Sequence, residues 1–371
     1  MKIENFISYE QPTNYIVHSD QYTKDGQIPV LTAGQSFVLG YTDEEDGIYT
    51  GEPVVIFDDF TTSVQYVDFP FKVKSSAMKI LKNKQNANIK FCYYLLSWLQ
   101  KMPPNHKRQW ISTTSQIDVN LPPIEWQKKI VQKIEAVSNI IKYRKEELKK
   151  LDELVSARFV EMFGDAVANP MHWPIKKLKE LSVQINSGNT PKGGSENYVE
   201  DGITFFRSQN VWKDRLEMDD IAYIDAATHA SMKRSSLKHG DILMTKTGRI
   251  NTENSSLGRA ALYDGEDDMA NVNGHVYFIR LKDGVNNKFI LRILVSPEYR
   301  ELIRSVCVGG IDKRQLNKEH IEDFPIICPP SDMVDNYIVF ADQVDKSKVA
   351  VKKALDETQL LFDSLMQKYF G

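Results

Sequence analysis

One segment of this chain occurs twice, and the repeat constrains the fold more than any other feature of the sequence. Residues 121–164 align without a gap with residues 328–371. Both copies open with a Pro-Pro pair and close with Phe-Gly, and Val137 aligns with Val344. Because a long segment that does not read as helical precedes each copy, the repeat predicts a tandem duplication of a domain followed by a helix.

Each copy also carries the apolar period of a long helix that packs against another helix. Positions alternately four and three residues apart are mostly apolar, which is the 3.5-residue period of a coiled coil. The Pro-Pro pair favours a helix that begins directly after it, and Gly164 is suited to end the first helix. The residues predicted to form the seam are Ile130, Ile134, Val137, Ile141, Leu148, Leu151, Val155, Val344, Val351, Leu355, Phe362 and Leu365.

A single amphipathic helix lying on its own domain would explain either copy taken alone. Two copies in the same register favour an antiparallel coiled coil, in which each helix would be about 60 Å long. The predicted fold is therefore α+β. It has two mixed α/β domains in tandem, each followed by a long helix, and the two helices form an antiparallel pair with pseudo-two-fold symmetry.

The predicted domain boundaries follow from the positions of the two repeats. They are 1–123 for the first domain, 124–164 for the central helix, 165–330 for the second domain and 331–371 for the C-terminal helix. Short β-branched or aromatic runs, such as 54–57 and 203–206, predict strands in both domains. We expect helices at 87–99 and 289–304 and a short helix at 175–183.

The overall charge and the cysteines limit the function classes. The chain of 371 residues has 47 basic and 50 acidic residues, a formal net charge of −3, so DNA binding would have to depend on local patches. Three cysteines without CxxC spacing argue against a disulfide framework or a zinc site and fit a reducing cytoplasm. The N-terminus has no apolar signal segment, and the apolar run at 91–99 is too short to cross a bilayer, so we expect a cytoplasmic protein.

No catalytic, cofactor-binding or metal site is predicted. The sequence contains no phosphate-binding GxxxxGK[ST] loop and no HExxH metal motif. The Pro-Pro pairs lie in LPPI and CPPS, neither of which is the Asp/Asn-Pro-Pro-aromatic motif of amino-methyltransferases. Asp58 and Asp59 favour a turn or capping role over a metal pair, and Glu147-Leu-Lys149 lies in the long helix without a partner carboxylate for a nuclease. A self-sufficient enzyme is the least favoured hypothesis.

Polar loops at the ends of predicted strands suggest recognition of DNA. Backbone amides, hydroxyl groups and ammonium groups suit phosphate oxygens, whereas Arg, Gln and Asn side chains can read base edges. A solvated loop explains each segment taken alone, but Lys-Arg-Gln recurs just before each long helix. The candidate DNA-binding residues are Thr61, Thr62, Lys72, Lys74, Lys107, Arg108, Gln109, Asn189, Thr190, Lys192, Arg207, Gln209, Asn210, Lys246, Thr247, Arg249, Lys313, Arg314 and Gln315.

Several short motifs together give the chain a family resemblance. Besides the two Pro-Pro–helix segments, they are YEQPTNYIV at 9–17, VLTAG at 30–34, LGY at 39–41, FDDFTT at 57–62, KSS at 74–76 and SGNTP at 187–191. With these motifs the chain resembles the specificity subunits of type I restriction–modification systems over essentially its whole length. Its first domain, about 120 residues, is shorter than the second, about 160 residues.

The resemblance implies a non-catalytic subunit whose two target-recognition domains each read one half of a split double-stranded DNA target. The two helices would set the gap between the halves and dock two methyltransferase subunits, and we expect the Lys- and Glu-rich outer face at 142–153 to take part. S-adenosylmethionine would be bound by those partners, and ATP and Mg²⁺ by a motor-nuclease restriction subunit. The alternative is a coiled-coil scaffold that binds other proteins without recognising DNA.

Overall fold

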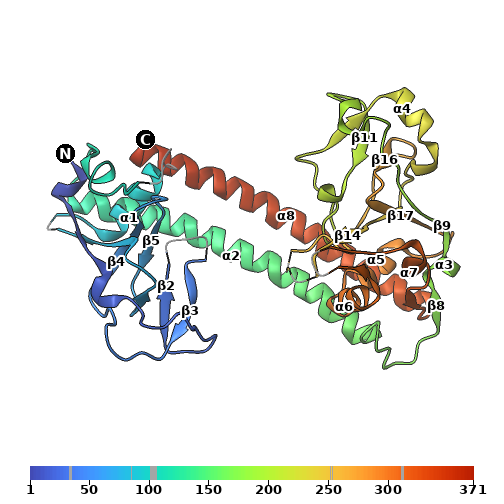
Figure 1. Cartoon of the computed structure of the whole chain (residues 1–371), viewed down its shortest axis with the longest axis horizontal. Coiled ribbons are helices and arrows are strands. Elements are labelled where there is room, and N and C mark those ends of the chain that lie inside the picture. Colours follow the sequence, from blue (N-terminus) through green and yellow to red (C-terminus); the bar gives the residue numbers. More distant parts are fainter. Residues whose placement is uncertain (33–35, 85, 101–106, 251, 253, 311–312) are drawn as a thin grey trace. The chain divides into compact units, whose positions relative to one another are not determined.

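The computed structural model divides the chain into two compact units. It describes all residues except 33–35, 85, 101–106, 251, 253 and 311–312, so that Ala33 and Gly34 of the VLTAG motif lie outside the described residues. The first unit comprises Met1–Leu148 with Ala350–Gly371, and the second comprises Lys149–Val349 (Figure 1). Each long helix therefore contributes one part to each unit.

The first unit is built mainly of strands. Its elements are η1 (Ile3–Asn5), β1 (Ile7–Glu10), η2 (Pro12–Tyr15), β2 (Ile28–Leu31), β3 (Val38–Thr42), β4 (Val54–Asp58), β5 (Val64–Val67), β6 (Lys72–Val73), β7 (Met78–Asn83), α1 (Ile89–Leu99), η3 (Thr114–Gln116) and the first part of α2 (Ile124–Phe163). The strands form one sheet in the order β1-β7-β4-β5 and a smaller sheet in the order β3-β2-β6.

Strand β4 separates two apolar clusters, because successive side chains of a strand point to opposite faces. Val55 and Phe57 pack with α1 and the buried Trp110 on one face. Val54 and Ile56 pack on the other face with the residues of β2, β6 and β7. Every side chain from Val54 to Phe57 is buried, which explains why the strand reads as a continuous apolar run.

The second unit contains more elements. They are β8 (Ile175–Lys177), α3 (Leu178–Leu181), β9 (Ser182–Ser187), η4 (Gly194–Asn197), β10 (Tyr198–Val199), β11 (Ile203–Phe206), η5 (Ser208–Asn210), β12 (Ala222–Ile224), α4 (Ala226–Ser231), η6 (Lys233–Ser235), β13 (Ile242–Thr245), β14 (Thr247–Gly248), β15 (Ala260–Leu262), β16 (Ala270–Val272), β17 (Val276–Leu281), α5 (Asn287–Val295), α6 (Pro297–Val306), β18 (Val308–Gly309), β19 (Arg314–Gln315), α7 (Lys318–Glu322), β20 (Pro325–Ile327) and the first part of α8 (Ser331–Phe370).

The described strands of the second unit form several small sheets. Four strands pair in the order β15-β13-β17-β9 and four in the order β10-β12-β11-β16, with shorter pairings β14-β19-β18 and β20-β8. Ile242 and Met244 of β13 face α5, α6 and the long helices, whereas Leu243 faces a second cluster with Phe206 and Phe278. This central strand is therefore buried on both faces.

Two predicted helices are wrong in detail. The helix expected at 289–304 is two helices, α5 and α6, because Pro297 cannot continue a helix and instead begins α6, where the hydroxyl of Ser296 caps the amide of Tyr299 at 3.2 Å. The helix expected at 175–183 is a strand, a single helical turn and a second strand. Pairing with β20 and β17 satisfies the backbone there and overrides local propensity.

The two long helices pack against each other in opposite directions. In the first unit, the start of α2, with Ile130 and Ile134, shares an apolar cluster with Met366 near the end of α8. In the second unit, the end of α2, with Phe159 and Phe163, packs on Tyr337 near the start of α8, with ring centroids 5.5 and 5.6 Å apart. The predicted antiparallel pair is confirmed, and all twelve predicted seam residues are buried or half-buried.

Polar contacts join the first long helix to the first domain. The side chain of Gln127 is fully buried and accepts a hydrogen bond from the amide of Asn88 at 2.8 Å. Its amide group donates to the carbonyl oxygens of Asn86 and Pro122 at 2.9 and 2.8 Å. The start of α2 is thereby fixed to the loop that begins α1. Among the described residues, no helix is both long and apolar enough to cross a membrane.

Candidate nucleic-acid interface

Two of the predicted polar segments meet in one small sheet of the second unit. Strand β13 ends at Thr245, and the chain continues through Lys246 into β14. In the antiparallel register, Thr247 lies opposite Gln315 and Gly248 lies opposite Arg314 of β19. The segments 246–249 and 313–315, which are distant in sequence, therefore form one edge of a surface.

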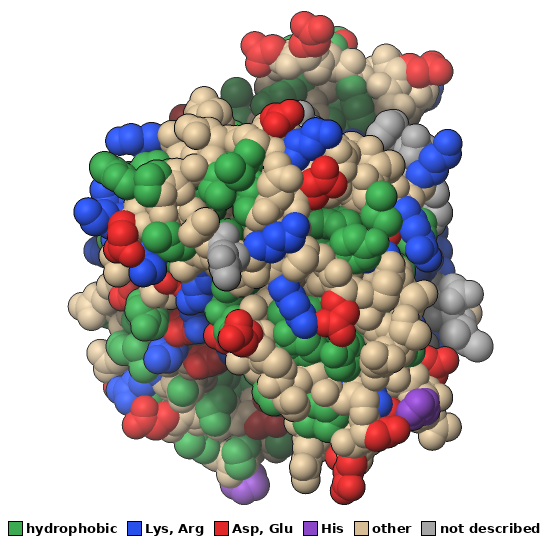
Figure 2. Space-filling view, turned by 90° about the vertical axis from the view of Figure 1, so that its left-hand side faces the viewer, with side chains coloured by type: hydrophobic (Ala, Val, Ile, Leu, Met, Phe, Trp, Pro, Cys, Tyr) green, Lys and Arg blue, Asp and Glu red, His purple; other side chains and the backbone are tan. Residues whose placement is uncertain are grey.

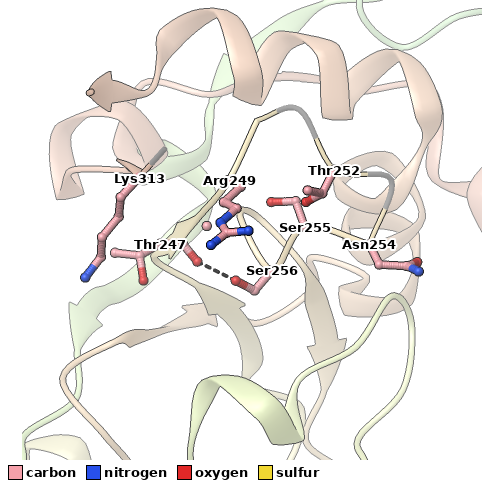
Figure 3. Close-up of a pocket in the computed structure, with 8 residues that line it drawn as sticks. Thr247, Arg249, Thr252, Asn254, Ser255, Ser256 and Lys313 are labelled. Carbon is pink, nitrogen blue, oxygen red and sulfur yellow. Dashed lines mark hydrogen bonds between the residues drawn. The ribbon is translucent and has the colours of Figure 1, made fainter. Parts of the chain in front are cut away.

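Thr252 and the residues 254–258 form the facing wall. The hydroxyl of Ser256 donates to the carbonyl oxygen of Thr247 at 2.7 Å (Figure 3). The amide of Gly258 donates to the carbonyl oxygen of Thr245 at 3.1 Å. A side chain at Gly248 would place its Cβ 2.3 Å from the amide nitrogen of Leu257. The wall can pack this closely only because residue 248 is glycine.

The space between these segments is an open, polar cleft of about 590 Å³. In this view, Arg249 lies between Lys313 on one side and Thr252 and Ser255 on the other (Figure 3). The described lining residues carry two cationic side chains and no carboxylate, and they are Thr247, Gly248, Arg249, Thr252, Asn254, Ser255, Ser256 and Lys313. Both cationic side chains are exposed, so the cleft offers positive charge and hydroxyl and amide groups to a ligand.

Two further arginines lie behind the cleft wall. The buried Arg259 donates from Nε to the carbonyl oxygen of Ser255 at 3.0 Å, and Arg300 donates from Nη2 to the same oxygen at 3.1 Å. Burial lowers the pKa of Arg259, and the nearby charges of Arg300 and Arg215 lower it further. Since an arginine remains protonated even so, these groups add positive potential behind the wall.

A turn at 272–275 gathers three other predicted segments. The amide of Asn189 donates to the carbonyl oxygen of Val272 at 3.2 Å, the amide of Asn273 to that of Phe206 at 3.0 Å, and the amide of Lys246 to that of His275 at 2.8 Å. The glycine-rich loop, the segment after β11 and the start of the cleft are thus adjacent to one turn.

Within these segments the side chains differ in accessibility. Thr190, Lys192, Gln209 and Gln315 are exposed, and Lys246 and Thr247 are half-buried. Asn189 accepts a hydrogen bond from Arg234 at 2.8 Å. Arg314 is half-buried, with Nη1 3.3 Å from the carbonyl oxygen of Cys307.

The segment after β11 has mainly internal partners. Arg207 forms an ion pair with Asp220 at 3.1 Å, and the amide group of Gln209 donates to the same carboxylate at 3.1 Å. Asn210 is buried and donates to the carbonyl oxygens of Glu217 and Asp220, each at 3.0 Å. Arg207 and Asn210 therefore hold the loop 217–220 in place, and Gln209 is the exposed member of the three.

In the first unit, Asp59 brings two predicted segments together. Its carboxylate accepts hydrogen bonds from the amides of Gln109 and Trp110 at 3.0 and 2.8 Å. Asp58 begins the neighbouring turn, where it accepts from the amides of Phe60 and Thr61, as the predicted turn role requires. Lys107 and Arg108 are exposed beside this turn, Thr61 is half-buried and Thr62 is buried.

The structure contradicts the prediction that Lys72 is a DNA-binding residue. Its side chain is 0% exposed, and its ammonium lies 2.5 Å from Glu44 and donates to the carbonyl oxygen of Asp46 at 2.8 Å. Lys74, which follows the end of β6, is exposed. Glu44 pairs with the ammonium group of Lys72 inside the domain, so the role of Lys72 is structural and we leave it out of the proposed interface.

Lys72 also bears on a possible metal site. His18, Glu44 and Asp46 each offer one ligand atom, and these atoms lie within 4.8 Å of one another. Burial raises the pKa of Glu44, but hydrogen bonds from Lys72 and from the amides of His18 and Ser19 outweigh it, so the net shift is downward. Because an ammonium already neutralises this carboxylate, we assign the group no metal-binding role.

The described residues also include site residues that the sequence did not indicate. Thr252, Asn254, Ser255 and Ser256 form the cleft wall, yet they lie in a polar run that is not next to a predicted strand. The density of hydroxyl and amide side chains there was the available signal. The face of the first unit in Figure 2 interleaves basic and acidic side chains, consistent with the near-neutral net charge.

Comparison with known proteins places the first domain in a family. Residues 3–153 match the type I restriction modification DNA specificity domain. The chain is 46% identical over 131 residues to the type I restriction enzyme EcoR124I/EcoR124II specificity subunit of Escherichia coli, covering 33% of this chain and 32% of the relative. It is 20% identical over 264 residues to the type I restriction enzyme MjaVIII specificity subunit of Methanocaldococcus jannaschii, covering 64% and 61%.

The fold matches solved structures over the whole chain. The crystal structure of the type I restriction-modification system S subunit from M. genitalium aligns with a TM-score of 0.61 at 14% identity, covering 100% of this chain and 95% of that one. A chain from a structural study of complex assembly and conformational transition of the type I R-M system aligns with a TM-score of 0.53 at 17% identity, covering 100% and 99%.

Two β-rich domains, each followed by a long helix, with the helices packed together, define the class as the specificity-subunit fold. Residues 3–153 match the type I restriction modification DNA specificity domain, and the whole chain shares the fold of a solved type I S subunit. The matched regions cover about a third of the length of the E. coli relative and less than two thirds of that of the M. jannaschii relative.

Proposed function

We propose that this chain is the non-catalytic DNA specificity subunit of a type I restriction–modification complex and that it reads a bipartite double-stranded target. The observation that carries the proposal is the polar cleft of the second unit, which has Arg249 and Lys313 and no carboxylate among its described lining residues. The family of the first domain supports the same function. On this proposal, residues 1–123 and 165–330 each recognise one half of the target.

The cleft chemistry suits both parts of DNA recognition. Arg249 and Lys313 would contact phosphate oxygens and provide salt-dependent affinity. Thr252 and Asn254, which are exposed, would offer hydroxyl and amide groups to base edges. In the first unit, Lys74, Lys107 and Arg108 are exposed and would play the phosphate-binding part. The formal net charge of −3 indicates weak binding by the chain alone, so partner subunits would supply much of the DNA clamp.

The two long helices would serve as the spacer between the two readers. A packed helix pair holds two domains at a set separation better than a flexible linker does. Two methyltransferase subunits would dock on the chain and bind S-adenosylmethionine, with the outer face at 142–153 as a docking surface. Motor-nuclease restriction subunits, where the complex includes them, would bind ATP and Mg²⁺.

The direct test uses this chain assembled with its methyltransferase partner. Methylome sequencing of cells that express both should reveal a split motif with a fixed gap. DNA affinity is then measured over a range of salt concentrations for Arg249→Ala, Lys313→Ala and the control Lys282→Ala, which removes an exposed lysine outside the cleft. Each cleft variant should weaken binding and reduce the salt slope by about one, whereas the control should change neither.

The alternative function, a protein-interaction scaffold, makes the opposite prediction. An assembled complex that forms normally but shows no sequence-specific DNA affinity or methylation would support the scaffold. A contiguous methylated motif would instead contradict the two-reader arrangement. Unchanged affinity and salt slope in both cleft variants would remove the cleft from the interface.

A further inference from the structure

A series of charged side chains connects the second domain to both long helices, and all of its members lie in the second unit. Asp214, in the loop between β11 and β12, forms an ion pair with Arg292 of α5. Arg292 also reaches Asp345 of α8 at 3.4 Å. Lys348 of α8 lies 3.2 Å from Asp345 and 2.6 Å from Asp152 of α2.

The Asp214 end of this series is held in an unusual backbone conformation. Its φ is +61°, in the left-handed region that residues other than glycine seldom adopt, and its amide donates to the carbonyl oxygen of Ala260 at 2.8 Å. Burial raises the pKa of its carboxyl group in spite of the neighbouring Arg292. The surrounding structure therefore holds the partly buried carboxylate of Asp214 in a strained loop, where it faces the guanidinium group of Arg292.

The same loop also reaches the cleft wall. Trp212 lies two residues before Asp214, and the guanidinium carbon of Arg259 is 3.8 Å from the centroid of its ring. Arg259 in turn holds the carbonyl oxygen of Ser255 in the cleft wall. The segment 212–214 thus contacts the support of the candidate DNA cleft on one side and, through Arg292, helix α8 on the other.

The apolar contacts at this junction do not fix an orientation by themselves. Phe159, Phe163, Phe289 and Tyr337 form a shared aromatic cluster between α2, α5 and α8. Burial of apolar area is non-directional, whereas the planar guanidinium group of arginine specifies the positions of the acceptors that it binds. Arg292 contacts acceptors on two different elements, so it can set the angle at which the domain sits on the helix.

We propose that Arg292 is a positioning residue that fixes the orientation of the second recognition domain on the helix pair and thereby restricts the gap length of the DNA target. This inference rests on the proposed function, since it requires a bipartite target. Arg292 is not among the residues that line the cleft. Its loss should therefore weaken the preference for one gap length without removing a phosphate contact.

The test uses the complex of the full chain with its methyltransferase partner. Initial methylation rates are measured on duplexes that carry the native gap and on duplexes with one base pair more or fewer. We expect Arg292→Met to reduce the preference for the native gap about tenfold or more, with an unchanged salt slope of binding. Arg292→Lys keeps the charge but not the planar fork and should give a smaller loss.

Two further variants keep the test informative if Arg292→Met folds poorly. Asp345→Asn removes the negative charge of the ion-pair partner on α8, a side chain that is 42% exposed, and should weaken the preference for the native gap in the same direction. Lys288→Met is the matched control, because Lys288 also joins α5 to α8, through a more exposed pair with Asp342, whereas Asp214 pairs with Arg292. It should preserve the gap preference.

The outcomes separate this inference from the proposed function. If both Arg292→Met and Asp345→Asn retain the native gap preference, Arg292 is not a positioning residue. A reduced salt slope in Arg292→Met would show a direct DNA contact, and an equal loss in Lys288→Met would show a general effect of charge on α5; either result overturns the inference. A wild-type complex that recognises no gapped DNA at all would overturn the proposed function itself.

Discussion

The guanidinium group of Arg144 in α2 donates hydrogen bonds to the hydroxyl group of Thr358 in α8. It also donates to the carbonyl oxygen of Ala354, one turn earlier in α8. Arg144 occupies a position of the apolar period of α2, between Ile141 and Leu148, where a charged side chain has to find partners. This contact lies within the first unit and fixes one register of α2 against α8, the best-attested use of a polar group in a helix seam.

The Arg144 contact predicts different results for two substitutions. Arg144→Ala removes both hydrogen bonds and the packing of the aliphatic part of the arginine side chain. We therefore expect the free energy of unfolding of the chain to fall by about 1–2 kcal/mol. Arg144→Met fills the same space with an apolar chain and should cost less than about 1 kcal/mol. Denaturant unfolding measures both values. Equal losses for the two variants would contradict the assigned hydrogen bonds.

The buried pair between Asp59 and Lys79 should matter far more than any surface pair. The two side chains are 2% and 1% exposed, their charged atoms are 3.3 Å apart, and Asp59 also accepts the amides of Gln109 and Trp110. Asp59→Ala leaves a buried ammonium without its carboxylate, so we expect a loss of about 3–5 kcal/mol.

Changing both members of the pair provides the control for this prediction. Asp59→Ala combined with Lys79→Met removes both charges and should recover part of the stability, since no unpaired charge remains. Thermal unfolding of the two variants gives the comparison. If the double variant is no more stable than Asp59→Ala, the loss of stability comes from the unpaired amides of Gln109 and Trp110 and not from the unpaired ammonium group.

The sequence predicts the long helices well because their signal is local and repeated. Pro-Pro, an apolar 3.5-residue period and a closing Phe-Gly predict 124–164 and 331–371, and the helices span Ile124–Phe163 and Ser331–Phe370. The antiparallel pairing follows from the same repeat, since each helix needs a partner for its seam and the second copy offers one.

The cleft was only partly predictable, because tertiary pairing assembles it. Arg249 and Lys313 were identified as polar loop residues, but their proximity depends on the pairing of β14 with β19 over a long stretch of sequence. Ser255 joins them only because Arg259 and Arg300 hold its carbonyl oxygen. Lys72 is a case in which the sequence misleads. A lysine is expected at the surface, but the ion pair with Glu44 allows this one to be buried.

The ion pair between Glu10 and Lys82 predicts a pH dependence. The hydrogen bond from Lys82 lowers the pKa of Glu10 below its ordinary value of 4.5, against the opposing effect of burial. A carboxyl group whose pKa is lower in the folded state adds stability above the unfolded pKa and loses it as the pH falls through the folded pKa. The pair therefore contributes at neutral pH and not in strong acid.

The corresponding variant is Glu10→Gln. Because both members are partly exposed, with 31% and 42% of each side chain accessible, the difference from wild type at pH 7 should be no more than about 0.5 kcal/mol. It should shrink towards zero as the pH falls below 4.5. Unfolding midpoints measured between neutral and acid pH provide the check, and a difference that grows in acid would contradict the assigned direction.

Gly248 offers the sharpest test of the cleft, because its backbone needs no unusual conformation and only the space is limiting. In Gly248→Ala, the new Cβ would lie 2.3 Å from the amide nitrogen of Leu257 and 2.7 Å from the hydroxyl oxygen of Ser255. The wall would have to move away from β14, which displaces Ser255 and Ser256. We expect specific DNA affinity of the assembled complex to fall about tenfold, with the salt slope unchanged because no cation is lost.

Gly310→Ala is the matched control, since a Cβ at Gly310 would have no heavy atom of the described residues within 4 Å, apart from its chain neighbours. It should leave both affinity and unfolding midpoint unchanged. In Gly248→Ala, a normal affinity would mean that DNA does not contact the wall, because a displaced wall could not preserve hydrogen bonds to base edges. A loss of affinity together with a reduced salt slope would instead indicate that the substitution has moved Arg249, which adjoins it in the chain, away from its phosphate.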